Sequence, residues 1–198
     1  MQIDTKNFES LIASPNLDSE LHMIRHFNCV SENLRNKLTE NDISSSQIDN
    51  NLLVPGSRFY TSFASNINQL LIKAFMYDFT HHLGDNGNWL LNFKIPNSEF
   101  PSGIGTKTVV NINEISISEH INIYVEKNRG VPLLHLNVKS LPTTNEFVII
   151  LKPVVDRFIF ITAFPGPAAM PLPVDTLEKS LFESCKTFWD SHVFLVLK

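Results

Sequence analysis

The stretch "FVIILKPVVDRFIFITAF", residues 147–164, decides the fold class. It contains two apolar runs, 147–152 and 158–164, that are rich in the β-branched and aromatic residues favoured in strands. The connection between them is too short for a crossover helix, so the two strands should be antiparallel neighbours. Because both runs are almost continuously apolar, we expect them at the centre of a sheet, covered on both faces.

The rest of the second half continues this strand pattern. Short β-rich segments separated by turn residues precede the central pair, at 89–95, 106–112, 121–127 and 133–138. After the pair, apolar residues at helical spacing predict a closing helix within 174–192. The last residues, 193–198, are expected to form an edge strand or an extended tail.

The first half has helical spacing instead. Apolar residues recur every three or four positions over 17–38 and again over 57–84, where Gly84 suits a helix C-terminus. The polar, serine-rich residues 39–51 between them predict a loop or linker.

The predicted class is therefore α+β, with N-terminal helices packed on an antiparallel sheet of about five to six strands and a C-terminal helix. Residues 1–50 would form a helical N-terminal region and residues 51–198 an α+β domain, unless the two make one continuous domain.

The composition limits the function classes. The chain has 198 residues, of which 43% are hydrophobic and 18% charged, which is globular rather than disordered. Its net charge of -4 argues against a generally basic nucleic-acid binder. Only two cysteines occur, Cys29 and Cys185, so we expect no disulfide framework and a reducing compartment, the cytoplasm. No apolar run approaches the roughly 20 residues that span a bilayer, and no secretory signal is evident, so no membrane partner is predicted.

Three groups of zinc-ligand type recur on the first helical stripe: His22, His26 and Cys29. Their spacing can place them on one helical face. However, the Glu of an HExxH motif and an obvious fourth ligand are both missing, so the polar flank of an amphipathic helix is the favoured interpretation. The sequence therefore predicts no metal site and no cofactor.

Two other segments carry residues that can do acid–base or anion chemistry. His81 and His82 could exchange protons near neutral pH, or they could be cations favoured at a helix C-terminus. Lys107 at the start of a strand and Arg129 in a tight turn could each hold an anion. The alternative for both is a solvated surface side chain.

Residues 142–166, "PTTNEFVIILKPVVDRFIFITAFPG", resemble the C-terminal strands of toxin ribonucleases of the barnase–EndoU–colicin–RelE fold. In that family a late strand often ends in TAFP or TAYP, which matches Thr162 to Pro165 here. The resemblance implies metal-independent cleavage of RNA through attack by the 2′-hydroxyl, and an immunity protein as a partner. Only Thr162 is matched by the motif.

The other roles in such a reaction are assigned from chemistry. His81 or His82 would be the acid or base, because cleavage needs a proton donor and a proton acceptor. Lys107 and Arg129 would supply positive charge. Thr162, together with Thr144, would donate hydrogen bonds to phosphate.

Two alternatives stay open. The first is a non-catalytic interaction domain, immunity-like or an assembly factor, whose sheet or acidic helical face binds a protein. The second is a small-molecule pocket between the sheet and the long helix, lined by Phe side chains. A ribonuclease must gather its site residues in one concave patch, whereas simple alternation puts Thr162 on the face of Phe158 and Phe160.

Overall fold

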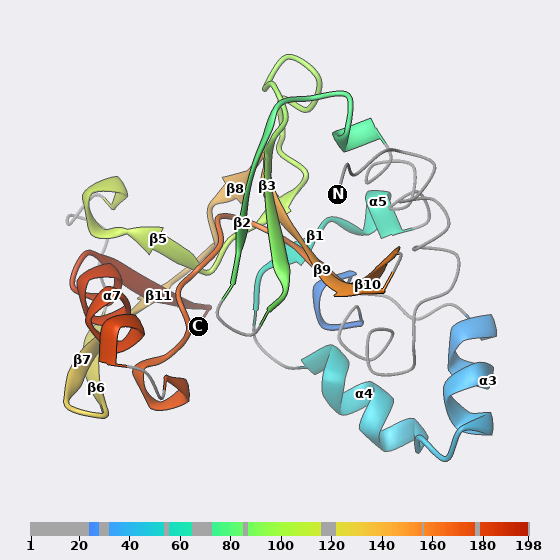
Figure 1. The fold of residues 1–198 in the computed structure, drawn as a ribbon, viewed down its shortest axis with the longest axis horizontal. Coiled ribbons are helices and arrows are strands. Elements are labelled where there is room, and N and C mark those ends of the chain that lie inside the picture. The colour runs from blue at the N-terminus through green and yellow to red at the C-terminus, as the bar shows by residue number, and fades with distance from the viewer. Residues whose placement is uncertain are drawn as a thin grey trace. The chain divides into compact units, whose positions relative to one another are not determined.

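The computed structural model describes these residues: 24–27, 32–53, 56–64, 73–84, 87–115, 122–155, 157–176 and 179–197. They form an α+β fold with a C-terminal helix, as predicted (Figure 1). The chain divides into two compact units, which are described separately. Unit 1 is Met1–Thr106 with Thr143–Pro167, and unit 2 is Lys107–Pro142 with Ala168–Lys198. The expected boundary near residue 50 stays a prediction.

The described residues of unit 1 form two antiparallel sheets rather than one. Its four-stranded sheet has the order β10-β9-β3-β2, so each strand pairs with the next one of that sheet along the chain. The strands of this sheet are β2 Phe79–Leu83, β3 Trp89–Lys94, β9 Glu146–Val154 and β10 Arg157–Pro165. A smaller sheet has the order β1-β4-β8. Its strands are β1 Arg58–Phe59, β4 Gly105–Thr106 and β8 Thr143–Thr144.

The stretch that decided the fold class forms β9 and β10, which are antiparallel as predicted. β9 is central, between β10 and β3, but β10 pairs only with β9 among the described strands, so its central placement was wrong. The pairing of β10 with β9 contains one irregularity. The register shifts between Phe160 and Thr162, a β-bulge that adds one residue and turns the following side chains to the other face.

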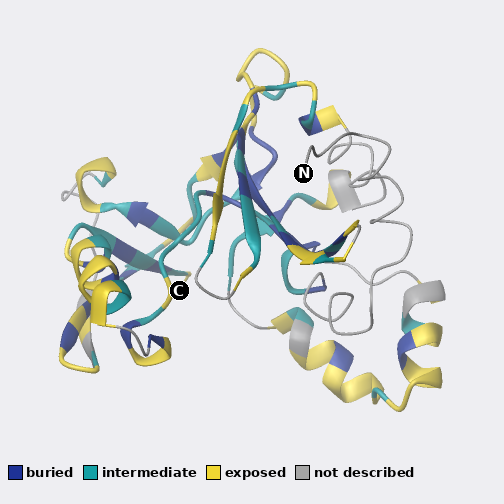
Figure 2. Ribbon diagram, viewed as in Figure 1, coloured by how far each residue is buried: buried dark blue, intermediate teal, exposed yellow. Residues whose placement is uncertain are grey.

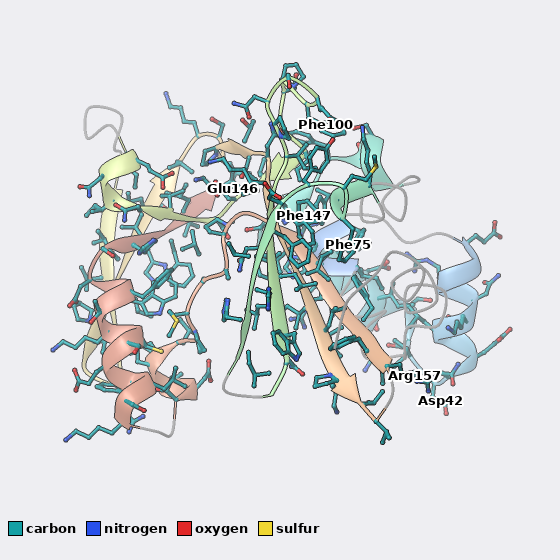
Figure 3. The ribbon with its side chains drawn as sticks, turned by 45° about the horizontal axis from the view of Figure 1, so that its top comes forward. Asp42, Phe75, Phe100, Glu146, Phe147 and Arg157 are labelled. Carbon is teal, nitrogen blue, oxygen red and sulfur yellow. The ribbon has the colours of Figure 1, made fainter. Side chains whose placement is uncertain are left out.

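One face of the four-stranded sheet is the core of unit 1 (Figure 2). Phe147 and Phe93 are opposite residues of β9 and β3, and their rings stack with centroids 4.9 Å apart. Phe75 meets Phe93 edge-on at 5.2 Å, and Figure 3 labels Phe75 and Phe147. Each such buried ring stabilises the fold by roughly 1.5–3 kcal/mol.

The small sheet has no space for side chains at Gly105. A Cβ there would lie 2.4 Å from the carbonyl oxygen of Arg58, which is backbone and cannot move aside. The glycine lets β1 and β4 approach closely. The ring centroid of Phe59, on β1, lies 6.2 Å from that of Phe147.

The predicted loop at 39–51 was wrong, because most of it is helical. Unit 1 has three labelled helices, α3 Glu32–Glu40, α4 Ser45–Leu53 and α5 Thr61–Ala64. The serine tract caps α4: the amide of Gln47 donates to Ser44 Oγ, and the amide of Ser44 donates to Gln47 Oε1. Ile48 is fully buried and packs with Leu38 and with Ile24 of the helical residues 24–27.

The predicted helix over 57–84 was also wrong. Within this range the structure has β1, the one-turn helix α5, a short helical turn at 73–74 and the strand β2. The segment "FTHHL" contains one aromatic and one β-branched residue, and it pairs with β3 along its whole length. Gly84 lies in the turn between β2 and β3 rather than at a helix end.

Unit 2 contains one mixed sheet with the order β5-β11-β7-β6. Its elements are β5 Val109–Asn111, η1 Ile112–Glu114, β6 Asn122–Asn128, β7 Val131–Val138, η3 Pro173–Asp175, α7 Lys179–Trp189 and β11 His192–Leu197. β6 and β7 are antiparallel, as their two-residue turn requires. β11 is neither an edge strand nor a tail, since it lies between β5 and β7 and runs parallel to β7.

The sheet of unit 2 is apolar on both faces. Cys185 and Trp189 of α7 pack with Val131 and Leu133 of β7, so Cys185 is a packing residue. On the opposite face, Leu136 packs with apolar residues of β5 and β11. A strand with both faces buried suits an internal position, which explains the place of β11.

Eleven strands in three sheets occur in the ranges that the structure describes, more than the five or six expected, although the α+β class is as predicted. Among the described helices, none has both the length and the apolar character needed to cross a membrane.

Candidate functional site on the sheet of unit 1

The four-stranded sheet of unit 1 has a second face, opposite its core, that carries both polar and apolar side chains. Directly opposed residues of an antiparallel pair point to the same side, so the register assigns each side chain to a face. Phe93 and Phe147 mark the core face. The other face, here called the outer face, carries residues of all four strands: Thr80, His82, Leu90, Asn92, Lys94, Glu146, Val148, Ile150 and Thr162.

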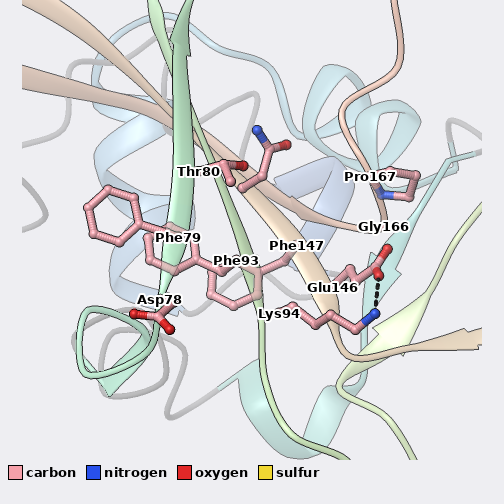
Figure 4. Close-up of a pocket in the computed structure, with 10 residues that line it drawn as sticks. Asp78, Phe79, Thr80, Phe93, Lys94, Glu146, Phe147, Gly166 and Pro167 are labelled. Atoms are coloured by element: carbon pink, nitrogen blue, oxygen red, sulfur yellow. Dashed lines mark ion pairs between the residues drawn. The ribbon is translucent and has the colours of Figure 1, made fainter.

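A pocket of about 280 Å³ opens on the outer face, at the end of the sheet where β3 stops and β9 begins (Figure 4). It is lined by Asp78, Phe79, Thr80, Asn92, Phe93, Lys94, Glu146, Phe147, Gly166 and Pro167. Lys94 Nζ lies 3.1 Å from Glu146 Oε1 across the β3–β9 pair. Both side chains are more than one-third exposed, so this ion pair contributes at most about 1 kcal/mol.

Asp78 immediately precedes β2 and lines the pocket from that side. It is exposed and has no ion-pair partner among the described residues. Since Lys94 is neutralised by Glu146, the pocket carries one uncompensated negative charge.

β2 is an edge strand of this sheet among the described strands. The direction of its backbone hydrogen bonds follows from the adjoining turn. Gly84 continues the register of β2, and its N–H donates to the Asn88 carbonyl at 2.7 Å. Hydrogen-bonded and non-bonded pairs alternate in an antiparallel ladder, so Thr80 and His82 bond to β3. The backbone N–H and C=O groups of Phe79, His81 and Leu83 therefore point away from β3.

The far side of β3 agrees with this assignment. The Ile95 N–H donates to the Asn145 carbonyl at 3.0 Å, in register with the β3–β9 ladder. By the same alternation, Asn92 directs its backbone groups toward Thr80 of β2. Within the described part of the chain, β3 is the only strand that pairs with β2, so β2 presents an unpaired edge.

A hydrogen-bonded cluster ties the segment before β2 to the segment after β3. Lys73 Nζ donates to Glu99 Oε2 at 2.6 Å. Hydrogen bonds from Lys73 and then from Tyr77 hold the pKa of Glu99 below its ordinary value, and the bond to Glu99 raises the pKa of Tyr77. The cluster thus fixes the start of β2 next to the pocket.

The two predicted histidines lie on β2, not at a helix C-terminus as expected. Both are exposed, and because they are consecutive in a strand they point to opposite faces. His82 is on the outer face. The ring of His81 lies 5.2 Å from that of Trp89 and 6.2 Å from that of Phe79.

The bulge moves Thr162 off the face of Phe158 and Phe160, so the alternation argument was wrong. Thr162 pairs with Ile150, and both share the outer face with His82. Its side chain is only 2% exposed, and Oγ1 has no hydrogen-bond partner within the described ranges. Three strand spacings separate it from His82, about 14 Å, so the two side chains do not converge on one phosphate.

Thr144 has a backbone role. It is buried in β8, and its Oγ1 accepts the N–H of Glu146 at 3.0 Å. This bond shapes the turn that leads into β9.

Lys107 and Arg129 belong to unit 2 and have partners there. Lys107 Nζ lies 2.7 Å from Glu114 Oε2, with the lysine side chain only 14% exposed, and this hydrogen bond lowers the pKa of Glu114. Arg129 has a left-handed φ of 49° in the β6–β7 turn. Its guanidinium donates to the Thr176 carbonyl and lies 4.8 Å from the Phe182 ring centre.

Of the candidate metal ligands, only His26 is described, and His22 and Cys29 lie outside the described residues. The Nδ1 atom of His26 is 2.9 Å from the carbonyl oxygen of Ser57, so its ring is held by the backbone. In the portion of the chain that the structure covers, no three His, Cys, Asp or Glu side chains gather as metal ligands would.

Four residues that line the pocket were not predicted as site residues: Asp78, Asn92, Lys94 and Glu146. Alternation within "WLLNFK" was a usable signal, since it puts Asn92 and Lys94 on one face of β3 and Leu91 and Phe93 on the other.

No protein-family model, curated protein or solved structure matches this chain.

Proposed function

We propose that this chain is a non-catalytic interaction domain that binds an extended segment of a partner protein along β2. The observation that carries the proposal is the edge of β2 that no described strand pairs with, where three residues point backbone donors and acceptors outward. A segment that adds to such an edge gains a ladder of main-chain hydrogen bonds, with side-chain contacts giving selectivity.

The residue types of β2 support this proposal. Proteins usually protect an edge strand with Lys, Pro, a bulge or a covering element. The segment "FTHHL" has no Lys or Pro, its register with β3 is unbroken, and four of its five residues are exposed. Leu83 alone leaves 58% of its surface open to solvent.

The charge of unit 1 favours a protein over RNA. Over its full sequence, 9 Lys and Arg stand against 13 Asp and Glu, a net charge of -4. RNA binding draws most of its affinity from cations placed against phosphates, so this unit repels a polyanion. We also place the protein in a reducing compartment such as the cytoplasm, in keeping with the buried Cys185 thiol.

The test uses two substitutions at one position. His81→Pro removes an outward N–H without breaking the β2–β3 ladder, whereas His81→Ala removes only the side chain. Phage-displayed random twelve-residue peptides are selected on the full chain, and their affinities are then measured for each variant. We expect at least tenfold weaker binding to His81→Pro and no more than a threefold change for His81→Ala. Equal binding to both variants, or no selected peptide, contradicts the proposal.

A ribonuclease is the second candidate, and one observation favours it. The bulge at Ile161 puts Thr162 on the outer face, the side away from the aromatic core and the same side as His82. The separation of about 14 Å between these residues weighs against a shared phosphate. Incubation of the purified chain with tRNA and ribosomal RNA, beside an active ribonuclease, decides between the candidates. We expect intact RNA, and cleavage that His82→Ala abolishes would establish the enzyme instead.

A further inference from the structure

We propose that the pocket on the outer face receives one lysine or arginine side chain of the segment that adds to β2, with Asp78 as the counter-ion. This inference rests on the proposed function and names the chemistry of its partner. The partner is a protein with an extended, basic segment.

The size of the pocket favours a single side chain. Pockets for small molecules and cofactors usually enclose about 300–1,000 Å³. At about 280 Å³, and open on one side, this pocket falls below that range. It also lies between strands on the outer face, not between the sheet and a long helix as the small-molecule alternative required.

The lining suits a long cationic side chain. Pro167 supplies apolar surface that can cover part of a methylene stem. Asp78 at the β2 side can hold the charged end. An anionic group would instead meet Asp78 and Glu146 with only Lys94 between them.

The distance from an added strand to the pocket also favours a long basic side chain. A strand added to β2 would lie about 4.8 Å from it, on the side away from β3. The added residue opposite Asp78 would have its Cβ within about 5.5 Å of the Cβ of Asp78. A side chain of four or five heavy atoms beyond that point can follow the outer face into the pocket, while a short side chain cannot.

The experiment compares two synthetic peptides of nine residues that alternate Thr and Val. One has arginine at its centre, and the other has citrulline, which keeps the shape and removes the charge. We expect the arginine peptide to bind at least fivefold more tightly to the full chain, and this preference to fall toward one in Asp78→Asn. Asp175→Asn, which removes an exposed carboxylate in unit 2, serves as the matched control and should keep the preference.

Each outcome of this experiment bears either on the basic side chain or on the proposed function. Equal binding of the two peptides, a preference that survives Asp78→Asn, or no binding of either peptide overturns this inference. If both peptides bind equally and both are lost in His81→Pro, the edge function stands and only the basic side chain is wrong. If library peptides and synthetic peptides alike ignore His81→Pro, the proposed function itself fails.

Discussion

The two units build their sheets in different ways. In unit 1, the strands of the larger sheet pair in chain order, and the β2–β3 and β9–β10 turns are short. In unit 2, the last strand of the chain is inserted between β5 and β7, parallel to β7. A short turn dictates an antiparallel neighbour, but a parallel pair depends on a distant segment. This difference shows that a hairpin can be predicted from the local sequence, whereas the position of β11 in its sheet depends on the burial of both its faces.

The largest expected effect tests whether the units are separate in energy as well as in contacts. Phe147→Ala removes a fully buried ring of unit 1 and should lower the free energy of unfolding by about 3–5 kcal/mol. Hydrogen exchange should then speed up in β3 and β9 while β7 and β11 keep their protection.

Leu136→Ala is the counterpart in unit 2, where Leu136 is buried on the face away from α7. It should have the opposite pattern, with faster exchange in β7 and β11. Equal loss of protection in both units for both variants would mean one cooperative fold, and the comparison would lose its energetic basis.

A smaller effect tests the bonding assigned to β2. His82→Pro should lower the free energy of unfolding by about 2–3 kcal/mol, because it removes an N–H that bonds to β3 and leaves a strained ladder. His81→Pro should cost less than about 1 kcal/mol, because its N–H points to the open edge. Urea denaturation of both variants measures the difference. The reverse order of stabilities would show that the other side of β2 is the open one.

The smallest effect concerns unit 2 and depends on pH. The hydrogen bond from Lys107 lowers the folded-state pKa of Glu114 below its ordinary value of 4.5, so the pair stabilises the fold above that value. This stability is lost as the pH falls through the lowered pKa. Glu114 is half exposed, so Glu114→Gln should cost at most about 1 kcal/mol at pH 7.

Thermal unfolding of Glu114→Gln and the wild type across pH 3–7 makes this measurable. The two curves should approach each other at the acid end, where the wild-type carboxylate is protonated. A constant difference at all pH values would assign the effect to lost packing rather than to the ion pair.

The α+β class was predictable because strand runs such as 147–152 carry their own signal of β-branched and aromatic residues. The errors have two physical sources. In the first half, Phe79 and nearby apolar residues matched a helical period by chance, while pairing with β3 decided the strand. In the serine tract, the polar composition suggested a loop, although Ser44 and Gln47 form a capping box at the start of α4. This helix is stabilised by the burial of Ile48, which cannot be predicted from the local sequence.

The candidate site was predictable only in part. His81 and His82 were singled out, but the position of the pocket depends on which strands are neighbours, and this is not written in any one segment. The bulge is the clearest case. One extra residue at Ile161 reverses the face of Thr162, and no local pattern in "RFIFITAF" marks it.

The insertion of Lys107–Pro142 within unit 1 has a consequence for biosynthesis. After β3 leaves the ribosome, about 50 residues must follow before its central partner β9 begins, which at 5–20 residues per second takes roughly 3–10 s. Unit 2 cannot close either until β11, its final strand, has been made. Until β9 and β11 have been made, the sheet of each unit therefore stays incomplete on the nascent chain, with apolar strands open to aggregation.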